Sequence, residues 1–209
     1  MGKAALVWTL WSALLVSTQA DTNHAEALEF STHANTSPRL TAIRAEGSIQ
    51  NGDTTRLQVF LAAQPRRPIS AIYLSSPGGS LYEGLRLGRY FKDNRIKTIV
   101  EGGSICASAC AFAFLGGHDE KGKPWRSSSD NSQLGFHAFS TPGQPLRNEN
   151  ETQHTVADLL AYGQEIDAPL DLLVAAFATP SDQMYWLSQL EICRLGIKLW
   201  SNELKRFLC

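Results

Sequence analysis

An alternation of short apolar strands with amphipathic helices constrains the fold of this chain most strongly. The segment at residues 71–75 (AIYLS) is continuous and apolar, as strands of a buried parallel sheet are, and residues 96–100 (IKTIV) form a similar run. A helix with apolar residues at i, i+3 and i+4 follows Asp53, and a second runs from Ser80 to about Lys92. This order predicts an α/β domain with a largely parallel sheet.

Further segments extend this pattern towards the end of the chain. The sequence predicts strands at residues 40–48, 133–139 and 197–200, and helices at residues 105–115, 150–164, 167–178 and 188–196. Residues 118–132 are polar and charged, and we expect them to form a loop. The S-x-x-E spacing of a capping box starts at Ser80 and again at Ser188.

The first twenty residues have the layout of a secretory signal peptide. Lys3 supplies a positive start, an apolar run from Ala4 to Val16 follows, and small residues precede Ala20 as at a cleavage site. The run is shorter than the roughly 20 apolar residues that a membrane-spanning helix needs, although an uncleaved anchor is the alternative. We therefore expect cleavage after Ala20 and a periplasmic or secreted protein.

One domain is expected after this leader. Residues 21–39 are polar without a sustained period and are predicted to be a flexible lead-in to a single domain at residues 40–209. The chain has 209 residues, with 19 Lys and Arg against 20 Asp and Glu, for a net charge of −1. A chain of that balance has no broad basic surface, so nucleic acid is not an expected partner.

The chain has four cysteines, at positions 106, 110, 193 and 209. The predicted export determines how they are interpreted. Without a CxxC pair and matching histidines, a metal site is not expected. In an oxidising compartment an even number suggests disulfides, and we expect the pairs Cys106–Cys110 and Cys193–Cys209. An i, i+4 separation on a helix places Cα atoms about 6 Å apart, within disulfide range. Thiols buried as small apolar groups are the alternative.

Two features are candidates for chemistry. Gly78 and Gly79 follow a buried strand and lead into a helix, which lets backbone N–H groups approach a ligand, although a plain tight turn has the same pattern. Ser108 lies between Ala107 and Ala109 at the start of an apolar segment. A nucleophile there would have small neighbours and a helix dipole that stabilises an oxyanion, whereas most such serines only pack or cap.

A serine nucleophile needs a base and a group that orients the base. His137 lies in an alternating strand and is the best-placed histidine, although a lone histidine in a strand is more often structural. The downstream carboxylates Asp167, Asp171 and Asp182 are candidates for the orienting group. Spacing alone does not choose among them.

The stretch from about Ile43 to Gly117 resembles the proteolytic subunit of the Clp protease and its superfamily, which includes signal peptide peptidases and crotonases. The resemblance rests on AIYLSSPGGS and SICASACAFAFLGG, and further on LGFHAF and MYWLSQLEICRLGI. It implies a Clp protease/crotonase-like core of repeated β-β-α units in a spiral, with a mostly parallel sheet and flanking helices. The leader and the cysteines around Ser108 depart from the cytosolic enzyme and point to a periplasmic branch.

The resemblance also implies roles for particular residues. Ser108 matches the nucleophile and His137 the general base, and the N–H groups of Gly79 and Ala109 match the oxyanion hole. Asp182 is the nearest match to the third member of the triad. The implied protein is a secreted or periplasmic serine peptidase that hydrolyses peptides or unfolded proteins through an acyl-enzyme. It would need no cofactor or metal and no ATPase partner, and self-association through residues 150–165 is compatible with the family.

Two other functions share this fold. A non-catalytic member would use the same groove to bind an extended peptide or would act as a scaffold. A crotonase-like enzyme would act on acyl thioesters. That reading fits export badly because coenzyme A is a cytosolic cofactor, and it leaves the Ser108 and His137 pair unexplained.

Overall fold

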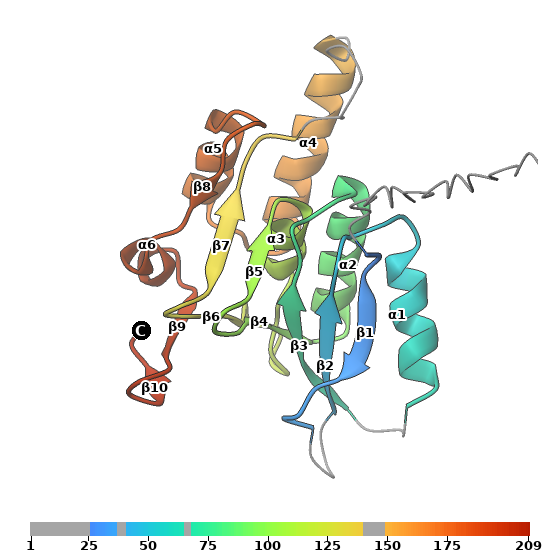
Figure 1. Cartoon of the computed structure of the whole chain (residues 1–209). Coiled ribbons are helices and arrows are strands. Elements are labelled where there is room, and N and C mark those ends of the chain that lie inside the picture. The colour runs from blue at the N-terminus through green and yellow to red at the C-terminus, as the bar shows by residue number, and fades with distance from the viewer. Residues whose placement is uncertain (1–25, 37–40, 65–67, 140–148) are drawn as a thin grey trace, which may run out of the picture.

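A seven-stranded sheet forms the centre of the computed structural model, which describes residues 26–36, 41–64, 68–139 and 149–209. Its strands are β1 (Glu29–Thr32), β2 (Thr41–Glu46), β3 (Ile69–Ser75), β4 (Lys97–Val100), β6 (Arg126–Ser129), β9 (Lys198–Ser201) and β10 (Arg206–Phe207). They lie in the order β1-β2-β3-β4-β6-β9-β10, with five parallel strands between antiparallel edges (Figure 1).

A second, smaller sheet carries the segments that matter most for the candidate site. It consists of β5 (Ile105–Ala107), β7 (Gln133–Phe136) and β8 (Tyr185–Trp186). β7 lies in the middle, parallel to β5 and antiparallel to β8. A parallel bridge between Ser76 and Cys106 joins the end of β3 to β5, so the two sheets adjoin at the carboxyl end of β3.

Six helices flank the sheets within the described residues. They are α1 (Asp53–Ala62), α2 (Leu81–Asp93), α3 (Ala109–Phe114), α4 (Glu149–Glu165), α5 (Leu170–Ala178) and α6 (Gln189–Arg194). α2 and α3 lie behind the strands in Figure 1. The two helices approach closely because α2 presents a glycine: a Cβ at Gly84 would lie 2.5 Å from the carbonyl oxygen of Ala109.

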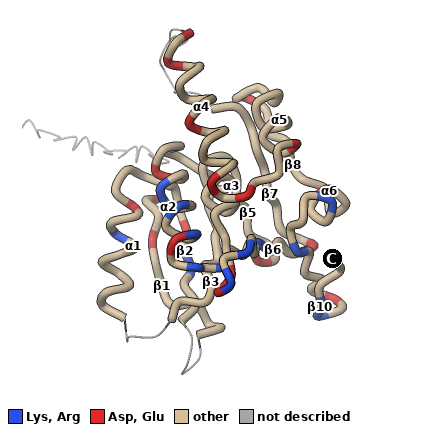
Figure 2. The backbone as a smooth tube through the Cα atoms, turned by 180° about the vertical axis from the view of Figure 1, so that it is seen from behind, with Lys and Arg blue, Asp and Glu red and all other residues tan. Residues whose placement is uncertain are grey.

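The structure is therefore a mixed α/β fold with a mostly parallel sheet and flanking helices, as the alternation of elements predicts. The core lies between the large sheet and the helices, and all six residues of α3 are buried in it. In the view of Figure 2, Lys and Arg are mixed with Asp and Glu along α2 and around β3 rather than gathered on one face. Within the described residues, no helix is long and apolar enough to span a membrane.

The prediction of one helix over residues 105–115 is wrong. Residues 105–107 form β5, and α3 begins only at Ala109. The chain turns at Ser108, whose φ of 56° lies in the left-handed region that a helix cannot contain. β5 is bonded to β7 over only three residue pairs, which is too short a strand for its period to be visible in the sequence.

The loop predicted at residues 118–132 contains a central strand, β6. Its sequence is Arg-Ser-Ser-Ser, and all four residues are buried. Arg126 is buried because its guanidinium donates hydrogen bonds to the carbonyl oxygens of Ile166 (2.5 Å) and Asp167 (3.2 Å), just after α4. The cation thus satisfies carbonyls at a helix C-terminus, where the helix dipole favours positive charge. A buried strand of polar residues has no hydrophobic pattern to predict it.

The lead-in predicted at residues 21–39 also contains structure. Residues 29–32 form β1, and the ring of Phe30 lies 6.2 Å from that of Phe60 on α1. The predicted leader at residues 1–20 lies outside the described residues.

Of the two predicted capping boxes, the first is wrong. Ser80 makes no side-chain cap of α2 and instead donates to the side chain of Asn51 (2.7 Å). Glu83 accepts hydrogen bonds from the N–H and hydroxyl of Thr54, so this carboxylate secures α1 to α2. α1 likewise begins after Gly52 rather than after a capping Asp53.

The second capping box is confirmed and sets a pH dependence of stability. Glu191 accepts hydrogen bonds from the hydroxyl (2.6 Å) and N–H (2.8 Å) of Ser188 and from the hydroxyl of Tyr185. The hydrogen bonds from Ser188, followed by that from Tyr185, lower the pKa of Glu191 to about 2. Because the folded-state pKa is below the ordinary value of 4.5, this carboxylate stabilises the fold above that pH and loses its contribution as pH falls towards 2.

We expect the free energy of unfolding to decline over this acid range, and to decline less in a Glu191→Gln variant. Urea unfolding followed by circular dichroism from pH 6 to about pH 2 measures both proteins. Parallel curves for the wild type and the variant would contradict the role of Glu191.

Candidate active site

Ser108 occupies a sharp turn between β5 and α3. Its φ of 56° and ψ of −124° place a non-glycine residue in a strained conformation, which is typical of nucleophile elbows between a strand and a helix. The N–H of Ser108 donates to the carbonyl oxygen of Gly135 in β7 (3.0 Å), and the Ser108 residue is half-buried. The turn therefore places Ser108 beside β7, where the residue is still partly accessible.

A disulfide joins the two sides of this turn. Cys106 in β5 and Cys110 in α3 are bonded, with their Cα atoms 5.3 Å apart. Cys193 and Cys209 form the second bond, with a Cα separation of 5.7 Å. Both predicted pairings are confirmed, although the first spans a strand, a turn and a helix rather than one helical turn. The bond closes a short loop whose central residue is Ser108.

Gly78 and Gly79 pass directly beside Ser108. A Cβ at Gly78 would lie 2.7 Å from Cβ of Ser108 and 2.8 Å from the carbonyl oxygen of Ala107, so only glycine fits at this position. Its φ of 107° and the φ of 139° at Gly79 are also conformations that other residues rarely adopt. The strand end after β3 and the Ser108 turn are thus in van der Waals contact.

The N–H groups of Gly79 and Ala109 at this junction lack an acceptor among the described residues. The residues before and after Gly79 both bond to Ile49. The carbonyl oxygen of Gly78 accepts the Ile49 N–H (2.8 Å), and the N–H of Ser80 donates to the Ile49 carbonyl oxygen (2.9 Å). The Gly79 N–H therefore points away from Ile49. Ala109 is the first residue of α3, where an N–H has no intrahelical partner. Such donors are what an oxyanion hole requires.

His137 follows β7 directly and lies two residues beyond Gly135. Its Nδ1 is 2.6 Å from the carbonyl oxygen of Ala138. A carbonyl oxygen only accepts, so Nδ1 carries the proton and Nε2 of the neutral ring is left as the acceptor. The ring is half-buried. This is the tautomer that a general base for a serine hydroxyl needs. No hydrogen bond joins Ser108 to His137 within the described part of the chain.

The three candidate carboxylates are all exposed. Asp182 lies in the turn before β8, near the point where the Ala138 N–H donates to the carbonyl oxygen of Thr179 (2.9 Å). Among the described residues Asp182 makes no hydrogen bond with His137, so its role as the third member stays a prediction. Asp167 and Asp171 lie at the turn before α5 and in its first turn, and neither makes a hydrogen bond to the histidine.

The acceptor that does contact His137 was not predicted from the sequence. It is the backbone carbonyl of Ala138, and a main-chain atom has no residue-type pattern that would reveal it. The sequence offers the Gly78-Gly79 pair as a candidate feature but does not predict the close approach of Gly78 to Ser108. Within the described residues, no group of three or more His, Cys, Asp and Glu side chains is placed to hold a metal.

Comparisons with known proteins support the fold. No protein-family model matches this chain, and no curated protein matches it. Among solved structures, it is similar to a serine-to-alanine mutant of the 1510-N membrane-bound stomatin-specific protease, at 19% sequence identity and a TM-score of 0.53. The alignment covers 79% of this chain and 81% of that one. At this identity the likeness establishes a shared α/β fold, of the kind that a protease uses.

Proposed function

We propose that this protein is a secreted or periplasmic serine peptidase of the Clp-protease-like type. The arrangement of groups around Ser108 is the observation that carries the proposal. Ser108 lies in a strained turn, the N–H groups of Gly79 and Ala109 beside that turn are unpaired among the described residues, and His137, in its proton-accepting tautomer, follows β7, whose Gly135 accepts the N–H of Ser108. The fold shared with a protease supports the same reaction class.

The proposed reaction is acyl transfer to water. Nε2 of His137 takes the proton from the Ser108 hydroxyl while Oγ attacks the peptide carbonyl carbon, and the N–H groups of Gly79 and Ala109 stabilise the oxyanion. The histidine then returns the proton to the leaving amine as the C–N bond breaks. Water, activated by the same histidine, hydrolyses the acyl-enzyme and regenerates Ser108. In this scheme the Ala138 carbonyl orients the imidazole, as a carboxylate does in a standard triad.

A non-catalytic peptide-binding protein is the second candidate, and a specific observation favours it. The candidate acid Asp182 is exposed and makes no hydrogen bond to His137 among the described residues. A carbonyl acceptor stabilises a charged imidazolium less than a carboxylate does. A site of this kind would bind an extended peptide at the strand end beside Gly79 without cleaving it.

Hydrolysis of unstructured peptides separates these two functions. The assay uses a library of quenched fluorescent peptides, because folded substrates would require an unfoldase. The peptidase proposal expects turnover of part of the library by wild type, with cleavage sites identified by mass spectrometry. Peptide binding without any cleavage would contradict the peptidase proposal and support the peptide-binding function.

The two disulfides should have different effects on activity. In a chain-entropy description, the short Cys106–Cys110 loop contributes about 2 kcal/mol to stability and the longer Cys193–Cys209 loop about 3 kcal/mol. Only the first bond holds the Ser108 turn. We expect replacing Cys106 and Cys110 by alanine to lower kcat at least tenfold, because the nucleophile and its N–H groups lose their fixed geometry.

The matched control replaces Cys193 and Cys209 by alanine. This variant should lose as much or more stability while keeping the wild-type kcat, measured at a temperature where both variants are folded. Equal losses of kcat in the two variants would show that the Cys106–Cys110 bond has no special role at the site.

A further inference from the structure

A cavity of about 570 Å³ lies on the large sheet and shares no residue with the Ser108 site. Register shows which face of the sheet it occupies: Tyr73 of β3 pairs with Ile99 of β4, and Ile99 pairs with Ser127 of β6. Paired residues point to the same side of a sheet, whereas the buried neighbours Ile72 and Leu74 point to the other side. The cavity is therefore on the face opposite the core, and its volume is typical of small-molecule sites.

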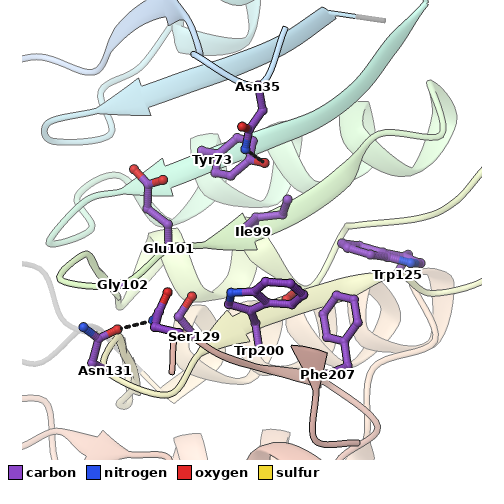
Figure 3. A pocket seen from close by; sticks show the side chains of 12 residues that line it. Asn35, Tyr73, Ile99, Glu101, Gly102, Trp125, Ser129, Asn131, Trp200 and Phe207 are labelled. Carbon is purple, nitrogen blue, oxygen red and sulfur yellow. Dashed lines mark hydrogen bonds between the residues drawn. The ribbon is translucent and has the colours of Figure 1, made fainter. Parts of the chain in front are cut away.

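The lining of this cavity is divided between aromatic and polar side chains. In Figure 3, Trp200, Trp125 and Phe207 lie together on one side, while Glu101, Ser129 and Asn131 lie on the other. The aromatic rings pack edge to face. The centroid of the Phe207 ring lies 5.1 Å from that of Trp200 and 6.1 Å from that of Trp125. A ligand that fits this lining needs an apolar face and a polar rim.

Polar groups of the lining are left without partners by the protein. Ser127 and Ser129 are only 3% and 6% exposed, and neither hydroxyl forms a hydrogen bond among the described residues. Both serines nevertheless line the open cavity. Among the described residues, the buried side-chain atoms that lack a partner are Nε2 of His118 and Nε of Arg126, so the hydroxyls of Ser127 and Ser129 are accessible from the cavity and free to bond a ligand or solvent.

Two asparagines present both kinds of hydrogen-bonding group. The Nδ2 group of Asn202 donates to Oδ1 of Asn131 (2.7 Å) and to Asp130 (2.9 Å). This arrangement leaves the Nδ2 donors of Asn131 and the Oδ1 acceptor of Asn202 without a partner in the described structure. The pair sits against Gly102, where a Cβ would lie 2.3 Å from Asn131 Oδ1. The rim thus offers donors and acceptors side by side, a match for hydroxyl groups, which both donate and accept.

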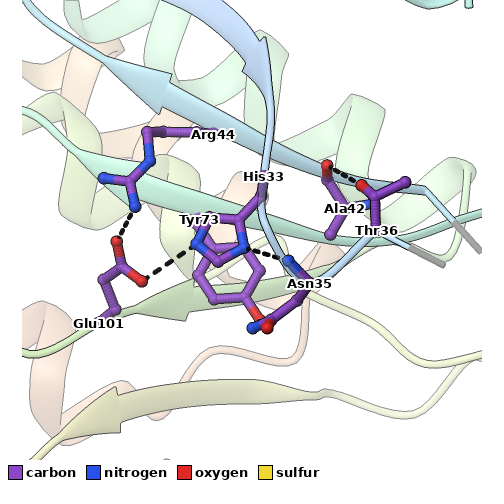
Figure 4. A network of polar contacts seen from close by, with 7 residues as sticks. All are labelled: His33, Asn35, Thr36, Ala42, Arg44, Tyr73 and Glu101. Atoms are coloured by element: carbon purple, nitrogen blue, oxygen red, sulfur yellow. Dashed lines mark hydrogen bonds and ion pairs between the residues drawn. The ribbon is translucent and has the colours of Figure 1, made fainter.

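The one charged residue of the lining is neutralised within the protein. Glu101 forms an ion pair with Arg44 and accepts a hydrogen bond from Nε2 of His33 (3.1 Å) (Figure 4). His33 accepts the N–H of Asn35 at Nδ1 (3.1 Å), which leaves the ring proton on Nε2 for Glu101. The same ring stacks on Tyr73 at 3.7 Å. Glu101 and Tyr73 are therefore fixed in place, and the lining holds no free cation for an anionic ligand.

We propose that this cavity binds a neutral saccharide. A sugar ring would place its C–H face against Trp200 and direct its hydroxyls to Ser127, Ser129 and the paired asparagines. A phosphate or carboxylate ligand lacks a lining cation, since Lys97 and Lys198 lie over the rings of Trp125 and Phe207 and outside the lining. A hydrocarbon would leave the hydroxyls of Ser127 and Ser129 without a hydrogen-bond partner. The proposal does not depend on the function of the Ser108 site.

The test measures binding of three neutral probes, maltotriose, cellotriose and triacetylchitotriose, by intrinsic tryptophan fluorescence and saturation-transfer NMR. We expect saturable binding of at least one probe. Trp200→Ala should weaken that binding at least tenfold. Gly102→Ala should weaken it severalfold with the fold intact, because the new methyl displaces the flexible Asn131 and Asn202 side chains. Trp186→Ala, a half-exposed tryptophan outside the cavity, should leave it unchanged.

Several results would overturn the proposal. One is the absence of saturable binding for all three saccharides, and another is binding that persists at wild-type strength in Gly102→Ala and in folded Trp200→Ala. Saturable binding of AMP without binding of the sugars would show that the aromatic rings of the cavity bind a nucleobase. Sedimentation that shows self-association lost in either variant, without sugar binding, would make this face an interface between copies. If Trp200→Ala does not fold, Gly102→Ala decides.

Discussion

Ser108→Ala is expected to lower kcat for peptide hydrolysis by at least about 10⁴-fold. The substitution removes only Oγ and keeps the Cβ that contacts Gly78, so the turn between β5 and α3 is left intact. Without the nucleophile no acyl-enzyme forms, and the unpaired N–H groups of Gly79 and Ala109 can supply only a residual acceleration. Initial rates on the best peptide of the library, with the wild type and variant at equal concentration, measure the effect.

His137→Ala and the double variant complete this experiment. Because the hydroxyl and the imidazole act as one unit, the double variant should be no slower than Ser108→Ala alone. Asp182→Ala should cost much less, since the Ala138 carbonyl holds the ring in place. Hydrolysis at the wild-type rate by folded Ser108→Ala would contradict the assignment, as would additive losses in the double variant.

Gly78→Ala should both destabilise the protein and abolish activity. The new Cβ would lie 2.7 Å from Cβ of Ser108 and 2.8 Å from the Ala107 carbonyl oxygen, and the φ of 107° is unfavourable for alanine. We expect a loss of about 3–5 kcal/mol in the free energy of unfolding, from overpacking and backbone strain together. Relieving the overlap must move the Ser108 turn away from the strand end, and kcat should fall at least about 10²-fold because reacting groups shift.

Gly103→Ala is the matched control for the backbone part of this effect. Its φ of 80° is also positive, but a Cβ there would meet nothing within 4 Å. It should cost about 1–2 kcal/mol and leave kcat unchanged. Chemical denaturation and peptide hydrolysis of the two variants measure both quantities. A Gly78→Ala protein as stable and active as Gly103→Ala would show that the close contact at Ser108 does not exist in solution.

The parts of the fold that were predicted correctly are those whose apolar residues form a continuous run or recur with a helical period. β3 and β4 are short apolar runs, and α2 packs one apolar face into the core, so all three are visible in the sequence. β6 is a buried polar strand held by Arg126, and nothing in its composition distinguishes it from a loop. Tertiary hydrogen bonds rather than hydrophobic burial determine that strand, and one sequence does not reveal them.

The candidate site was predicted in its residue types more than in its geometry. Ser108, His137, Gly79 and Ala109 stand on neighbouring elements, and the resemblance to Clp proteases implied that grouping. The strand-to-helix turn at Ser108 was missed because a single positive φ leaves no periodic trace. The saccharide cavity was missed for another reason. Tyr73, Ser129 and Trp200 are distant in sequence and meet only through the order of the strands.

Covalent labelling by a fluorophosphonate tests the central claim, an activated serine at position 108, most directly. The reagent reacts with serines whose hydroxyl is deprotonated by a neighbouring base and whose oxyanion is stabilised, and peptide mapping by mass spectrometry locates the adduct. We predict one adduct on the folded protein, at Ser108, that is lost in His137→Ala and in denatured wild type. Folded wild-type protein that carries no adduct at Ser108, or carries it equally in His137→Ala, would contradict the account.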